Sequence, residues 1–129
     1  MVDLVLVDTC VWASFFGKPR SVERRVVDVL IDLDRVALVG PVVTEVLIGF
    51  RKKREADWIA SRLKAAHEVI VSWEDWQGAA NLGRSLGAQG HKLPVTDLVI
   101  AAVCLRLDLE VYTTDPHFDL VAGLRRFKP

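Results

Sequence analysis

Three stretches of the sequence contain a single charged residue each, and in all three that residue is an acid. They are Asp8 in residues 4–17, Glu45 in residues 36–50 and Asp97 in residues 93–105. Charged residues make up 26% of the chain, so a window of this length would ordinarily contain about three or four of them. An isolated buried carboxylate is very costly unless something neutralises it, and no Lys or Arg stands beside these acids. A divalent cation neutralises several carboxylates at once, which makes a shared metal site the first hypothesis.

A fourth acid, Asp115, joins this set because of its position. Asp8 ends the apolar run 4–7, and Asp115 follows the run 111–113; both runs are typical of buried parallel strands. In open parallel α/β sheets, ligands bind beyond the carboxyl ends of the strands. We therefore expect these two aspartates at one edge of a sheet.

Two predicted helices supply the other acids. Asp97 lies in the first turn of a helix predicted over 95–107, where exposed backbone N–H groups favour an anion. Glu45 lies one turn into a helix predicted over 41–53, and its apolar neighbours lead us to expect that it faces the core. Both side chains are thereby predicted to point inward.

Each acid also has an ordinary structural explanation. Asp8 could cap a helix, Asp97 could complement a helix dipole, and Asp115 could open a turn. The structural explanation is weakest for Glu45, because a charge on the apolar face of a helix would be buried at a cost and would cap no helix end. Taken as a set, oxygen-only ligands select hard cations such as Mg²⁺ or Mn²⁺. Such sites activate water and neutralise charge on a phosphoryl group, so the sequence predicts phosphodiester hydrolysis.

Strand-like and helix-like segments alternate along the chain. The predicted strands are 4–7, 36–39, 69–71 and 111–113, with 124–127 as the candidate for a fifth, edge strand. The predicted helices are 11–16, 22–33, 41–53, 55–66, 74–86, 95–107 and 116–121. This alternation predicts a three-layer α/β fold in which helices flank a central parallel sheet of four or five strands. We expect residues 1–129 to form one domain, because no linker or repeat interrupts them.

Composition narrows the class of protein. The chain is 51% apolar, which is enough for a core, and its formal net charge is zero. Bulk attraction to nucleic acid is therefore not expected, although a local basic surface remains compatible with it. The two cysteines fit neither a disulfide framework nor a zinc site. No segment approaches a membrane span or a signal sequence, so we expect a cytoplasmic protein without a membrane partner.

Four short motifs resemble, in order, those of PIN-domain nucleases. They are VDTCVW at 7–12, PVVTEV at 41–46, LPVTDLVIAA at 93–102 and YTTDPHF at 112–118. The resemblance covers essentially the whole chain. The small size is most similar to a VapC-type toxin of a prokaryotic toxin–antitoxin pair.

The resemblance implies a metal-dependent endoribonuclease that uses Mg²⁺ or Mn²⁺ to hydrolyse RNA. It also implies a five-stranded parallel sheet, a homodimer and inhibition by a VapB-type antitoxin. Asp8 and Asp97 match the firmest metal ligands, and Thr9 and Thr114 match polar supports. By motif, the acidic cluster that serves both catalysis and metal binding consists of Asp8, Glu45, Asp97 and Asp115.

Basic residues directly follow the predicted helix that carries Glu45. They are Arg51, Lys52, Lys53 and Arg54. They either complement the dipole of a helix end or form a rim that contacts RNA phosphates. His117, two residues from Asp115, is either a surface side chain or a contact to a phosphate or leaving group.

Several other functions are disfavoured, and one stays open. A phosphoacceptor receiver domain needs an adjacent acidic pair after its first strand, and a dehalogenase-like phosphatase needs Asp-x-Asp where Cys10 stands. Neither a GxGxxG motif nor a P-loop occurs. The remaining alternative is a noncatalytic PIN-like scaffold that binds RNA or protein. A requirement for a divalent ion would separate the two.

Overall fold

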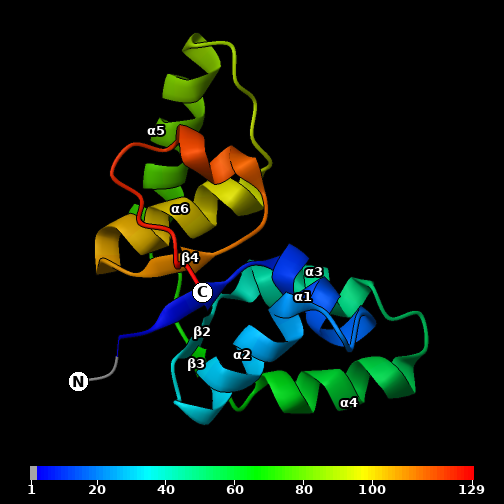
Figure 1. The fold of residues 1–129 in the computed structure, drawn as a ribbon. Coiled ribbons are helices and arrows are strands. Elements are labelled where there is room, and N and C mark those ends of the chain that lie inside the picture. Colours follow the sequence, from blue (N-terminus) through cyan, green and yellow to red (C-terminus); the bar gives the residue numbers. More distant parts are fainter. Residues whose placement is uncertain (1–2) are drawn as a thin grey trace.

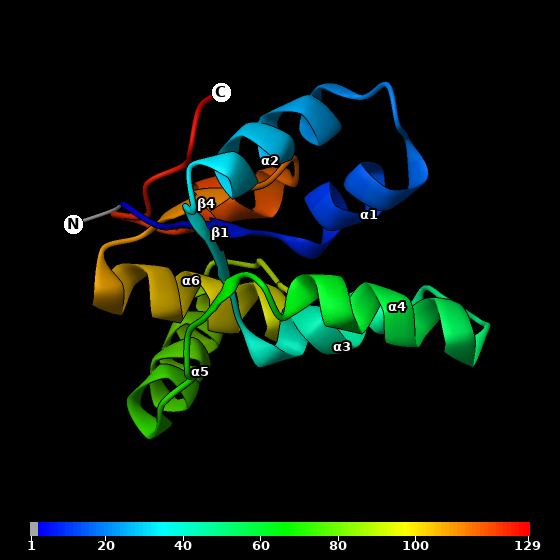
Figure 2. The same cartoon turned by 90° about the horizontal axis from the view of Figure 1, so that it is seen from below.

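A computed structural model describes residues 3–129, and its centre is a sheet of four parallel strands in the order β3-β2-β1-β4. The strands are β1 (Val5–Val7), β2 (Val36–Leu38), β3 (His67–Glu68) and β4 (Glu110–Tyr112). Helices lie on both sides of the strands (Figures 1 and 2). The predicted three-layer α/β fold with a parallel sheet is confirmed.

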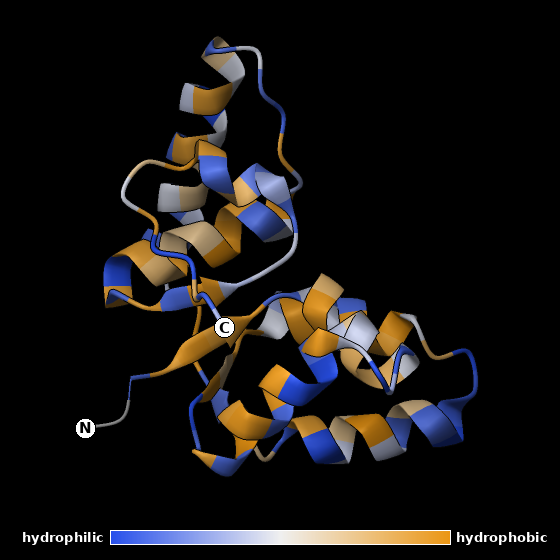
Figure 3. Cartoon of the chain, in the orientation of Figure 1, coloured by the Kyte–Doolittle hydropathy of each residue, from blue (hydrophilic) through white to orange (hydrophobic). Residues whose placement is uncertain are grey.

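The central strand β1 explains why its sequence is apolar without alternation. Its three residues are fully buried, because helices cover both faces of the sheet. Figure 3 shows this strand hydrophobic along its whole length. It pairs with β2 through Val5 and Val36, and with β4 through Val7 and Tyr112. The register places the residues after β1 and β4 at the same edge of the sheet.

The helix bounds are α1 (Thr9–Gly17), α2 (Val22–Asp32), α3 (Gly40–Ile48), α4 (Lys53–Leu63), α5 (Trp73–Ala88) and α6 (Val95–Leu107), with a 3₁₀ helix η1 at Pro116–Leu120. Helices α1, α2 and α5 each begin after a residue whose side chain accepts a hydrogen bond from one of the first N–H groups of the helix. Ser21 caps α2, and Ser72 forms a capping box with Asp75 at the start of α5. Asp8 caps α1, which therefore starts two residues earlier than predicted.

The predicted strand 69–71 is wrong in position, and the fifth strand is reduced to a single bridge. β3 occupies His67–Glu68, and its partner β2 ends at Leu38 because α3 begins two residues later. Val69 donates one more hydrogen bond to the Leu38 carbonyl at 2.7 Å, after which pairing stops. At the other edge, Val111 forms one parallel bridge with Arg126.

The prediction of one helix over 41–53 is also wrong. α3 ends at Ile48, and Gly49 and Phe50 donate to carbonyls only three residues back, which tightens the last turn. The chain then reverses, so that α4 runs alongside α3 (Figure 2). Glycine at the reversal lowers helix propensity where a continuous helix would have run on.

Helix α6 is held in place by its contact with α5. The two helices cross in both views, and Gly83 of α5 sits where a Cβ would lie 3.1 Å from the side chain of Leu98 (Figures 1 and 2). Arg106 donates to both carboxylate oxygens of buried Asp75, at 2.7 and 2.8 Å. These hydrogen bonds hold the pKa of Asp75 below its usual range. The pair fixes the helix that carries Asp97.

Within residues 3–129, no helix is long and apolar enough to cross a membrane.

Candidate metal and active site

Asp8 is held rigidly at the carboxyl end of β1. It is 4% exposed, and its carboxylate accepts hydrogen bonds from the Thr9 backbone N–H at 2.8 Å and the Thr113 hydroxyl at 2.8 Å. The Cys10 thiol donates to the same oxygen as Thr113, at 3.3 Å. Burial nevertheless raises the pKa of Asp8, because the three hydrogen bonds only partly offset desolvation. The carboxylate is thus oriented but incompletely neutralised.

Thr113 connects the first acid to the fourth, and sequence reasoning missed it. Its buried hydroxyl donates to Asp8 and accepts a hydrogen bond from the Asp115 backbone N–H at 2.9 Å. The predicted support Thr114 is exposed instead and reaches only the Cys10 sulfur, at 3.4 Å. Thr113 directly follows the buried residues of β4, and the chain becomes exposed only at Thr114.

Asp97 lies in the first turn of α6, as predicted, and is 8% exposed. The pKa of Asp97 is raised to about 6, mainly by burial and next by the charge of Asp8; the charge of Asp115 also raises it, and the His117 side chain lowers it. Asp8 and Asp115 therefore lie close enough to repel Asp97. The structure brings these three acids to one edge of the sheet.

Asp115 and His117 complete this side of the site. Asp115 caps η1 by accepting from the His117 backbone N–H at 2.9 Å. The His117 Nδ1 atom lies 3.3 Å from a carboxylate oxygen of Asp97 and 3.3 Å from one of Asp115. One ligand atom from each of the three residues falls within 4.8 Å of the others. His117 thus belongs to the cluster rather than to a remote surface.

Glu45 does not face the core as predicted. It is exposed, because the apolar side of α3 is formed by Val42 and Val46. Its carboxylate accepts a hydrogen bond from the Thr9 hydroxyl at 2.7 Å, which links α3 to the start of α1 beside Asp8. Glu45 therefore flanks the other three acids, and the predicted support Thr9 connects it to them.

The donor set fits a divalent cation. Among residues 3–129, none of the four acids forms an ion pair with Lys or Arg; His117 is the only basic side chain in contact with them. Carboxylates that are buried, mutually repulsive and without a basic partner are the arrangement that a metal ion neutralises. Asp97, Asp115 and His117 offer ligand atoms close enough to share such an ion, and Asp8 adds a nearby negative charge.

None of the four basic residues forms an ion pair with these carboxylates within residues 3–129. Arg51 and Lys52 fall in the connection after α3, and Lys53 and Arg54 begin α4. All four are exposed, and Lys53 pairs with Asp57 at 2.7 Å. Because α3 ends before them, they do not complement its last turn.

The raised pKa of Asp97 predicts that this acid destabilises the metal-free protein at neutral pH. A carboxyl whose folded pKa exceeds its unfolded value favours folding when protonated, and this contribution is lost as pH rises from about 4 through about 6. Asp97→Asn should therefore raise the free energy of unfolding at pH 7.5 in EDTA by about 2 kcal/mol. At pH 4 the gain should vanish. Urea unfolding at both pH values measures the effect.

Exposed Asp3 provides the control, since Asp3→Asn should change the stability little at either pH. A loss of stability in Asp97→Asn at pH 7.5 would contradict a destabilising buried charge at Asp97.

Comparisons with known proteins agree with this geometry. The PIN domain family model matches residues 5–124. A search of curated proteins finds no match. Similar solved structures include VapBC2 from Rickettsia felis bound to a promoter DNA fragment, at 16% identity, TM-score 0.82 and coverage of 96% of this chain and 97% of that one.

Two further structures share the fold at similar levels. FitAcB from Neisseria gonorrhoeae is 20% identical with a TM-score of 0.77, and each chain is covered to 97%. VapC20 from Mycobacterium tuberculosis, described as a toxin that cleaves the sarcin–ricin loop, is 17% identical with a TM-score of 0.72, at coverages of 97% and 99%. Together with the family match over nearly the whole sequence, these likenesses lead to one conclusion: the chain belongs to the PIN domain family.

Proposed function

We propose that this protein is a Mg²⁺- or Mn²⁺-dependent endoribonuclease and the toxin of a toxin–antitoxin pair. The observation that carries the proposal is the convergence of Asp8, Asp97 and Asp115 without a Lys or Arg partner among the described residues. A divalent ion bound there would supply Lewis-acid stabilisation of a phosphoryl group and an activated water. In this proposal, residues 1–129 form one nuclease domain.

The chain's own residues prepare the site for that chemistry. The hydrogen bonds from Thr9, Cys10 and Thr113 fix the Asp8 carboxylate while leaving it further acceptor capacity. The raised pKa of Asp97 makes this carboxylate more basic than an ordinary aspartate, so it can also accept a proton near neutral pH. Glu45, exposed and tied to Thr9, is placed to contact water or substrate at the margin.

RNA is the proposed substrate for two reasons. A related fold, VapC20, is described as cleaving the sarcin–ricin loop. The exposed Arg51, Lys52 and Arg54 also offer this neutral chain a local basic surface for phosphates. We retain these residues and Lys53 as the proposed RNA contact. The homodimer implied by the resemblance and the cytoplasmic location expected from the sequence stay predictions.

Cleavage of RNA by the purified protein should depend on the ion and on the buried acids. With Mg²⁺ or Mn²⁺, the wild-type chain should cut structured RNA, and EDTA should abolish the cut. Asp8→Asn and Asp97→Asn should each lower the rate about a hundredfold or more, because each removes a charge that would hold the ion. Gel analysis of end-labelled RNA measures both effects.

Asp108→Asn is the matched control, since Asp108 is an exposed aspartate at the end of α6 and should leave the rate unchanged. Full activity in both Asn variants would rule out the assigned acids. Ion-independent RNA binding without cleavage would favour the noncatalytic scaffold.

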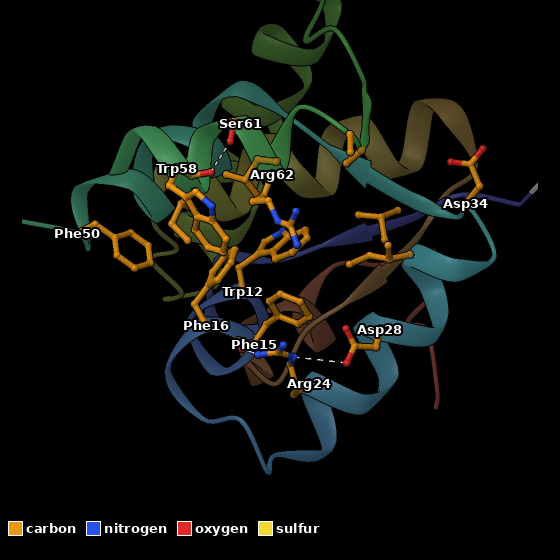
Figure 4. A pocket seen from close by; sticks show the side chains of 16 residues that line it. Trp12, Phe15, Phe16, Arg24, Asp28, Asp34, Phe50, Trp58, Ser61 and Arg62 are labelled. Atoms are coloured by element: carbon orange, nitrogen blue, oxygen red, sulfur yellow. Dashed lines mark hydrogen bonds and ion pairs between the residues drawn. The ribbon is translucent and has the colours of Figure 1, made fainter. Parts of the chain in front are cut away.

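A second surface supports the toxin–antitoxin part of the proposal. A cavity of about 600 Å³ opens between α1, α2 and α4. Figure 4 shows its aromatic lining, in which Phe15 and Phe16 from α1 lie near Trp58 from α4. Trp58 is 58% exposed, so this apolar surface is incompletely covered by the chain itself. We name this cavity the aromatic groove.

The aromatic groove suits an amphipathic helix with acidic flanks. Apolar anchors would fill the space between the aromatic side chains, as helices do in other hydrophobic grooves. Arg24 lies 4.4 Å over the Phe15 ring, and Arg62 lies 5.1 Å over the Trp58 ring. Arg62 forms no ion pair with any residue in 3–129, so it is available to form one with an acidic residue of the partner. The related structures named above include toxin–antitoxin complexes, and we propose an antitoxin of this kind here.

Disruption of the groove should free the enzyme from its antitoxin without reducing its activity. Trp58→Asp should cleave RNA normally yet have an at least about tenfold lower affinity for a VapB-type antitoxin that the wild-type chain binds, because a central aromatic anchor is lost. Isothermal titration of the purified pair measures the affinity.

Trp73→Asp gives a matched comparison, because Trp73 is 76% exposed on α5 and does not line the groove. Equal weakening by both substitutions, or by neither, would exclude the groove as the docking site.

A further inference from the structure

Among residues 3–129, His117 is the one basic side chain that contacts the acids of the site. Its Nδ1 atom lies 3.3 Å from both Asp97 and Asp115. Charge-assisted hydrogen bonds are ordinarily shorter, about 2.7–2.9 Å. Two ligand atoms bound side by side to one ion, each about 2.1 Å from it, would instead be separated by about 3.0–3.4 Å. The observed distances match the spacing of neighbouring ligands.

Contacts on both sides of His117 fix the backbone there, so the fold itself determines the position of the His117 side chain beside the acids. The His117 N–H donates to Asp115, and the next residue, Phe118, is 1% exposed and anchors η1 in the core. Arg126 braces the other end, donating to Asp119 at 2.7 Å and to the Thr113 carbonyl at 2.8 Å. The imidazole is therefore presented to the carboxylates by a braced segment.

Exposure leaves room for an ion and for solvent at the same position. The side chains of Asp97, Asp115 and His117 are 11%, 31% and 44% exposed, respectively. An ion held by these three would face solvent on the His117 side. This opening is what a site that admits water and substrate requires.

We infer that His117 contributes a nitrogen ligand to the metal site and makes it selective for Mn²⁺ and similar transition ions over Mg²⁺. The inference rests on the proposed function, because it concerns the same ion. Mg²⁺ binds chiefly oxygen, whereas imidazole is a good ligand for first-row transition metals. An imidazole added to the carboxylates therefore discriminates between ions that carboxylates alone would treat more alike.

The test is the affinity of the full chain for Mn²⁺ and for Mg²⁺, measured by calorimetry without RNA. Wild type should bind Mn²⁺ at least about tenfold more tightly than Mg²⁺. His117→Ala should weaken Mn²⁺ binding about tenfold or more and change Mg²⁺ binding less than about threefold. His91→Ala, at an exposed histidine before α6, should change neither. Pulsed EPR of Mn²⁺ bound to wild type should show coupling to an imidazole nitrogen that is lost in His117→Ala.

The outcomes separate the two proposals. Binding of both ions with no nitrogen coupling, or an equal loss for both ions in His117→Ala, overturns the role of His117 and leaves the proposed nuclease standing. If wild type binds neither ion, both the proposed metal-dependent nuclease and the proposed role of His117 are wrong.

Discussion

The carboxylates gathered at one edge of the sheet repel one another, and the rest of the structure must hold them together against this repulsion. Asp8, Asp97 and Asp115 come from three separate segments, yet each influences the charge of another. Burial strengthens this repulsion, because desolvation penalises the ionised form. Such a cluster persists only if the surrounding fold holds it in place. A cation that binds the folded protein would add binding free energy and offset the cost of the repulsion.

Each acid is held by contacts outside the cluster. Parallel pairing of β1 with β4 sets Asp8 and the segment that carries Asp115 side by side, and the Thr113 hydroxyl joins them. The Asp75–Arg106 pair and the close α5–α6 packing fix the helix of Asp97. The rigid frame means that the carboxylates need little reorganisation to bind an ion, which is the benefit of a preorganised site.

Much of this arrangement was predictable from local patterns. A continuous apolar run predicts a buried strand, and an acid that follows such a run is expected at the edge of the sheet. This pattern identified Asp8 and Asp115. Asp97 followed from its place in the first turn of an apolar helix. The capping box of Ser72 and Asp75 was also readable, because it depends on residues three apart.

The errors have a common origin in tertiary contacts. The end of α3 at Ile48 and the length of β3 depend on where their partners α4 and β2 lie, which no local window contains. Glu45 was expected inside because its neighbours are apolar, but the orientation of α3 against the core turns it toward Thr9. His117 and Thr113 belong to the site because of long-range contacts that local patterns do not show. His117 contacts Asp97, and Thr113 contacts Asp8.

The central claim is that the acid cluster is a cation site whose repulsion a divalent ion relieves. Its most direct test is the thermal unfolding of the wild-type chain with and without Mn²⁺, at pH 8 and pH 5. With all acids ionised at pH 8, saturating Mn²⁺ should raise Tm by about 5–10 °C. At pH 5, below the pKa of about 6 for Asp97, the rise should be much smaller, because protons compete with the ion. No rise in Tm at pH 8, or the same rise at both pH values, would contradict the account.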